Sequence, residues 1–139
     1  MPQLIETQTH STMNVPLILM ATLVGILLAG CASFPNEGKQ ALAKWVQGSK
    51  TPNVGYTIVS SQKATNQKYY RWARDYFSDY QEVWCVVTDN VIMEKGFPDV
   101  PIRHFIITKS GLLWQVLLTY VDEDKGGRDD FLGLGCSNW

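Results

Sequence analysis

The sequence predicts an α+β domain in which two N-terminal helices pack on an antiparallel sheet of three to four strands. Two observations support this fold class. Apolar residues recur at helical spacing over residues 36–47 and 69–80. From Glu82 onward the spacing changes to a period of two, in segments rich in β-branched and aromatic residues. Helices followed by consecutive strands are typical of the α+β class.

The first helix is expected from Asn36 to Gln47. Asn36 is of a residue type that commonly caps a helix N-terminus, and Gly48 follows the last turn as a stop signal. The apolar stripe expected to pack on the sheet consists of Ala41, Leu42, Trp45 and Val46.

The second helix is expected over residues 69–80, where aromatic residues follow helical spacing. Its stripe consists of Tyr69, Trp72, Ala73, Tyr76, Phe77 and Tyr80. This spacing is what burial of one helix face requires, so packing in the core is the preferred interpretation. Tyr70 lies off the stripe and is a candidate for stacking on a sugar ring.

The strands are expected to form a meander after a short strand at 56–60, with Lys109-Ser110-Gly111 as a tight hairpin. The first and last long strands are apolar at both parities, so both faces are covered or one face meets a partner. By analogy only, this arrangement is similar to cystatin-like and NTF2-like folds, with a helix across a curved sheet. The expected long strands are 83–88, extended by 91–93, then 102–108 and 112–121.

An apolar run extends from Val15 to Gly30 and is interrupted only by Thr22. A secretory signal peptide needs an apolar segment of about 7–15 residues that ends in small residues, whereas a membrane-spanning helix needs about 20. The length of the run alone leaves both interpretations open, together with a buried helix.

The end of the run, Leu28-Ala29-Gly30-Cys31, resembles the lipobox of bacterial lipoproteins. In that family the leader is cut before the cysteine, whose thiol carries a diacylglycerol, and the new amino terminus is also acylated, often with palmitate. Several acyl chains make a stable membrane anchor. The resemblance implies cleavage between Gly30 and Cys31, and lipid on Cys31 as the contact with the membrane.

The resemblance also implies a domain organisation and a location. Residues 1–30 would be the signal peptide, 31–35 a lipidated tether and 36–139 a single domain. Ala32 follows the cysteine, in place of the Asp that retains lipoproteins at the inner membrane, so the periplasmic face of the outer membrane is expected. Residues 1–14 depart from the pattern because they contain no Lys or Arg; Met13 is an alternative start.

Cys85 and Cys136 remain once the lipobox resemblance assigns Cys31 to lipid, and they can pair in one way only. In an oxidising compartment such a bridge would contribute roughly 4 kcal/mol. Two buried free thiols are the alternative. No metal is expected, because these cysteines and His104 make an incomplete ligand set without C-x-x-C spacing.

Charge is balanced overall but uneven along the chain. Residues 31–74 hold seven Lys or Arg and one acid, whereas residues 75–139 hold five and eleven, so the mature chain is neutral. This balance argues against a nucleic-acid-binding protein. The two halves are expected to interleave their charges on one surface; the alternative is a basic half that faces anionic lipid.

No catalytic fingerprint or cofactor motif is present, and a lone His104 is expected to be structural. The acidic segment 122–130 fits a calcium loop only in part: Gly126 and Gly133 stand where ligands are required, which favours a solvated loop.

The expected function is therefore a non-enzymatic interaction or assembly module of the cell envelope that binds another envelope protein. The alternative is a lipoprotein that binds glycan or inhibits a glycan hydrolase through exposed aromatics such as Tyr70 and Trp114. Trp139 is expected to pack back on the sheet, or to dock a partner.

Overall fold

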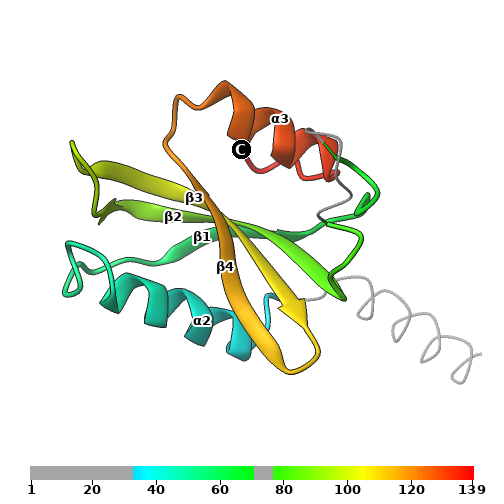
Figure 1. The fold of residues 1–139 in the computed structure, drawn as a ribbon, viewed down its shortest axis with the longest axis horizontal. Coiled ribbons are helices and arrows are strands. Elements are labelled where there is room, and N and C mark those ends of the chain that lie inside the picture. Colours follow the sequence, from blue (N-terminus) through cyan, green and yellow to red (C-terminus); the bar gives the residue numbers. More distant parts are fainter. Residues whose placement is uncertain (1–32, 71–76) are drawn as a thin grey trace, which may run out of the picture. The chain divides into compact units, whose positions relative to one another are not determined.

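A computed structural model describes residues 33–70 and 77–139, which belong to a compact unit that begins at Ser33. It confirms the α+β class and a four-stranded antiparallel sheet, with two helices (Figure 1). The elements in chain order are α2 (Asn36–Gln47), β1 (Ile58–Lys63), β2 (Glu82–Glu94), β3 (Val100–Ser110), β4 (Leu113–Tyr120) and α3 (Lys125–Gly133).

The strands form a meander in the order β1-β2-β3-β4, and the two helices cover opposite faces of the sheet (Figure 1). Alternate residues of β2 therefore enter different cores. Val83 and Cys85 pack in the core that contains Phe131 of α3, whereas Trp84 and Val86 pack in the core that contains Leu42 of α2. Burial on both faces explains why β2 is apolar at both parities. β4, the other strand with this pattern, is mostly half-buried and forms an edge of the sheet.

α2 has the predicted bounds, but its cap differs from the prediction. The N-cap residue is Pro35 and no side chain caps the helix, so Asn36 is already the first helical residue. The helix is held by burial. Leu42 is fully buried, and the ring of Trp45 meets that of Phe105 edge to face with centroids 5.2 Å apart.

The prediction that both helices are N-terminal is wrong, because the second helix is α3 near the C-terminal end of the chain. The predicted helix 69–80 begins in an irregular segment and ends in a turn, and its residues 71–76 lie outside the described residues. Tyr69 and Phe77 stack with ring centroids 6.3 Å apart. Both rings pack in the core that contains Phe131 of α3.

α3 forms where a solvated acidic loop was expected. The carboxylate of Asp124 caps the helix by accepting a hydrogen bond from the backbone N–H of Gly127 at 3.0 Å. Gly127 is buried, and a Cβ atom there would lie 2.4 Å from the ring of Tyr120 and 2.7 Å from that of Trp139. Glycine therefore permits close packing of the helix in this segment.

β2 runs without a break through Asp89 and Asn90, which separate the two predicted strand segments 83–88 and 91–93. Val87 pairs with His104, and the next pair is Ile92 with Ile102. β2 therefore advances by five residues where β3 advances by two, which makes a bulge in β2. The bulge is held by hydrogen bonds: Nε of Arg103 donates to the carbonyl oxygen of Thr88 at 3.1 Å.

Candidate interaction surface

A groove of about 570 Å³ lies between α2 and β4. Its aromatic walls are Trp45 of α2 and Trp114 of β4, both half-buried. The polar residues of the groove are Lys44, Ser49, Glu94, Lys95 and Gln115. Concave surfaces that combine aromatic rings with a few polar groups are typical of binding sites.

β4 forms one wall of this groove and is also an edge strand of the sheet. It contains no charged residue from Leu113 to Tyr120. A register shift opposite Ile106 and Ile107 leaves Leu117 as an extra residue, so the regular part of the edge is 113–116. Edge strands usually carry charges or bulges that prevent further pairing, and this stretch carries neither.

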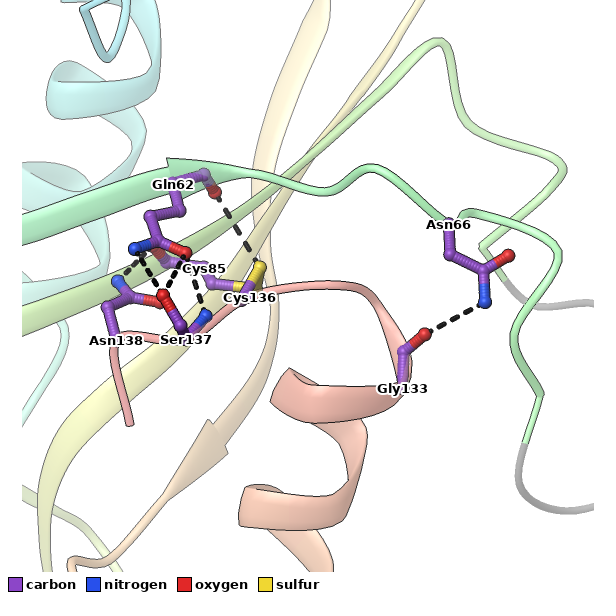
Figure 2. Close-up of a disulfide and its surroundings, with 7 residues drawn as sticks. All are labelled: Gln62, Asn66, Cys85, Gly133, Cys136, Ser137 and Asn138. Atoms are coloured by element: carbon purple, nitrogen blue, oxygen red, sulfur yellow. Dashed lines mark hydrogen bonds between the residues drawn. A yellow bond between two sulfur atoms is a disulfide. The ribbon is translucent and has the colours of Figure 1, made fainter.

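The opposite edge, β1, is less accessible to a further strand. It has an irregular register between Ile58 and Ser60, and it ends at Lys63, whose ammonium lies 3.2 Å from the carboxylate of Glu82. The C-terminal tail also lies against it, because the backbone N–H of Ser137 donates to Oε1 of Gln62 at 2.8 Å (Figure 2).

A disulfide between Cys85 of β2 and Cys136 of the tail holds this arrangement, with their Cα atoms 6.4 Å apart (Figure 2). This is the pairing that was predicted. Nδ2 of Asn138 donates to the carbonyl oxygen of Cys85 at 3.0 Å and adds a second connection. Sγ of Cys136 also lies 3.9 Å from the carbonyl oxygen of Gln62. In the disulfide this is a packing contact, because the sulfur carries no hydrogen.

His104 is buried beneath the end of the tail. Its ring stacks on that of Trp139, with centroids 4.0 Å apart and planes inclined by 18°. Burial lowers the pKa of His104, although the carboxylate of Asp122 opposes this shift. Nδ1 of His104 lies 3.4 Å from Oδ1 of Asp122, within the range of an ion pair but without hydrogen-bond geometry. Burial thus favours the neutral form of this imidazole over the charged form.

Ser60, His104 and Asp122 line one hollow of about 440 Å³, and serine hydrolases use these three residue types. The sheet register argues against that chemistry. Ser60 pairs with Val87, and Val87 pairs with His104, so Ser60 and His104 lie two strands apart. Strands are spaced about 4.8 Å apart, which separates the two backbones by roughly 10 Å. A nucleophile and its base need hydrogen-bond contact.

The structure separates the residues predicted to bind. Trp114 lines the groove between α2 and β4, whereas Trp139 packs on His104 and lines the hollow on the opposite face of the sheet. Tyr70 is 56% exposed and lines neither. Gly30 and Cys31, the predicted cleavage and lipidation residues, lie outside the described residues.

Sequence reasoning missed Trp45, Lys44, Glu94 and Lys95 as parts of one site. Trp45 has the spacing of a core residue, and its ring does pack on Phe105, so no local signal marks its second role in the groove. Lys44 belongs to α2, whereas Glu94 ends β2 and Lys95 follows that strand, so only the fold brings these charged residues together.

Within residues 33–70 and 77–139, no group of His, Cys, Asp and Glu side chains is arranged to hold a metal ion. No helix in the described part of the chain is long and apolar enough to cross a membrane. Comparisons with protein-family models, with curated protein sequences and with solved structures returned no significant match.

Proposed function

We propose that this chain is a lipid-anchored protein of the bacterial cell envelope, on the periplasmic face of the outer membrane. The lipobox Leu28-Ala29-Gly30-Cys31 and Ala32 after it support this location. The disulfide between Cys85 and Cys136 also supports it, because such bonds persist in oxidising compartments.

We further propose that the domain is a non-enzymatic module that binds another envelope protein by strand addition to β4. The observation that supports this best is the uncharged edge of residues 113–116 beside the groove between α2 and β4. An extended segment can hydrogen-bond to the free backbone groups of such an edge, while its alternate side chains enter an adjoining groove. With both sheet faces covered by helices, the edge is the surface left for a partner strand.

The groove defines the chemistry of the partner segment. An apolar or aromatic side chain fits between Trp45 and Trp114. Lys44 and Lys95 are exposed at the groove and favour acidic groups on the partner. The carboxylate of Glu94 is already engaged, because it accepts a hydrogen bond from Thr119 at 3.1 Å.

Site-specific photocrosslinking in intact cells tests this proposal. A photoreactive residue at Gln115, on the free edge, should yield a discrete crosslinked product that contains one envelope protein. The matched control is Val59, which is 57% exposed on the opposite edge strand and should yield no such product. Strand addition at β4 is wrong if Gln115 gives no product, or if both positions give the same one.

Glycan binding is the second candidate, because the two tryptophans of the groove can stack on sugar rings. Peptidoglycan fragments would then change the tryptophan fluorescence of the protein, and Trp114→Ala would abolish the change while Trp139→Phe would retain it. If neither fragments nor lysozymes alter the fluorescence, the glycan and hydrolase-inhibitor alternatives both fail.

A further inference from the structure

The turn between β3 and β4 exposes two leucines. Ser110 pairs with Leu113, so Gly111 and Leu112 form a two-residue turn, in which Gly111 has a φ of +61°. Leu112 is fully exposed at 100% and Leu113 is 59% exposed. Tight turns are usually made of Gly, Asn, Asp, Ser and Pro, so two adjacent leucines at this tip are unusual. Exposed apolar side chains of this kind can mark a site of contact with another surface.

The tip lies beside the point at which the described chain begins. Phe34 is buried, and its ring lies 5.3 Å from that of Trp84 and 6.4 Å from that of Trp114, the neighbour of Leu113. Gly38 permits this packing, because a Cβ atom there would lie 2.6 Å from Phe34 and 3.3 Å from Trp114. Figure 1 shows the β3–β4 turn and the N-terminal end of α2 on the same side of the sheet.

The chain leaves little freedom between this point and the proposed lipid. Cys31 precedes Phe34 by three residues, and an extended chain spans at most about 3.6 Å per residue, so the intervening chain can span at most roughly 11 Å. Lipid on Cys31 would therefore keep the bilayer surface near Phe34 and near the ring of Trp114, the sequence neighbour of Leu113. The polar headgroup layer is itself about 5–7 Å thick on each side of the hydrocarbon.

From this placement, we propose that Leu112 and Leu113 enter the interface of the bilayer that holds the lipid on Cys31. The inference rests on the proposed lipid anchor and adds a second, protein-mediated contact that orients the domain. Apolar side chains at the headgroup boundary are a recognised mode of membrane attachment. Lys109, near the tip, does not add to this contact, because its ammonium already lies 3.9 Å from the carboxylate of Glu82 and 5.8 Å from the ring centre of Trp114.

The orientation has a consequence for the groove between α2 and β4. Leu113 belongs both to the tip and to the lining of the groove, so the groove starts at the bilayer and extends away from it. A partner strand on β4 would then approach from a membrane-associated protein, with its own chain close to the lipid surface.

Nitroxide accessibility on the full-length, processed protein tests the membrane contact. Spin labels are placed by Leu112→Cys and, as the matched control, Leu132→Cys, a leucine 55% exposed on α3. In vesicles of phosphatidylethanolamine and phosphatidylglycerol, the label at position 112 should collide several-fold less with a water-soluble nickel chelate, and more with oxygen, than the label at position 132. Equal collision rates at the two positions would overturn the proposal.

The same samples separate this inference from the proposed function. Mass spectrometry of the N-terminal peptide and sedimentation with vesicles report the lipid anchor independently of the spin label. If the protein is lipidated and sediments with vesicles but the label at position 112 is fully accessible to water, the lipid anchor is retained. In that case the tip makes no contact with the membrane, and only the further inference fails. A protein without lipid on Cys31 refutes both, because the tip then has no bilayer fixed beside it.

Discussion

Trp139 stacks on His104, with ring centroids 4.0 Å apart and planes 18° from parallel. Phe131 of α3 meets Trp139 edge to face at 5.0 Å, so the tail, β3 and α3 share one aromatic cluster. Together with the disulfide, this cluster holds the last residues of the chain against the sheet. Trp139 therefore packs back on the sheet, which is the first of the two alternatives expected from the sequence.

Removing this ring should destabilise the domain. Trp139→Ala should lower the free energy of unfolding by about 3 kcal/mol, the lower end of the range for large aromatic truncations, because the ring is only partly buried. Urea denaturation followed by far-UV circular dichroism measures the change. Leu132→Ala is the control, since its side chain is 55% exposed and should change the stability little. Equal effects of the two substitutions would show that Trp139 does not pack as described.

His104 should make stability depend on pH. Burial lowers its folded-state pKa below the value of about 6.5 expected in the unfolded chain, so the unfolded state binds more protons between the two values. The contribution of His104 to the free energy of unfolding should be fully present above about pH 6.5. It should decrease as the pH drops from there toward the folded-state pKa.

Unfolding measured from pH 7.5 to 5 tests this dependence, and His104→Gln should flatten the curve over that interval. The lowered pKa values of Asp89 and Asp99 act below this window, since Thr57 and Lys50 stabilise their ionised forms. A slope that is unchanged in the His104→Gln variant would assign the dependence to another group.

Reduction of the disulfide should cost a large part of the stability. Cys85 and Cys136 are 51 residues apart, and a loop of that size corresponds to about 4 kcal/mol in the chain-entropy model. The double variant Cys85→Ala, Cys136→Ala should show a correspondingly lower urea midpoint, as should the wild type in reducing agent. Reducing agent should leave the midpoint of the double variant unchanged, which serves as the control. A wild-type midpoint unaffected by reduction would contradict the prediction.

The cap of α3 offers a smaller and more local test. Asp124→Ala removes the acceptor for the N–H of Gly127 and should cost about 1 kcal/mol. Asp124→Asn retains a capping oxygen and should cost much less. Amide hydrogen exchange in α3 should accelerate in the Ala variant alone; equal protection in both would show that the cap does not stabilise the helix.

Much of the sheet could be predicted from the sequence, because burial on both faces leaves a pattern. β2 is apolar at both parities for the reason found in the structure: α2 covers one of its faces and α3 the other. β4 is also apolar at both parities, but it is mostly half-buried at the edge of the sheet. The bounds of α2 were also predictable, since Gly48 ends its apolar stripe. These features depend on local periodicity, which tertiary packing reinforces here.

α3 could not be predicted, because its stabilising contacts are not local. Gly126 and Gly127 are poor helix formers and indicate a loop, yet the absence of a side chain at Gly127 permits contact with Tyr120 and Trp139. The groove was likewise invisible in the sequence, because Trp45 and Trp114 belong to elements far apart in the chain.

Lipid on Cys31 is the central claim, and mass spectrometry of the N-terminal peptide from the purified protein tests it most directly. The wild-type protein should begin at Cys31 and carry the mass of a diacylglyceryl group together with an N-linked acyl chain. Cys31→Ser should retain residues 1–30 and carry no lipid. A wild-type N-terminal peptide without lipid, or a Cys31→Ser variant processed like the wild type, would contradict the claim.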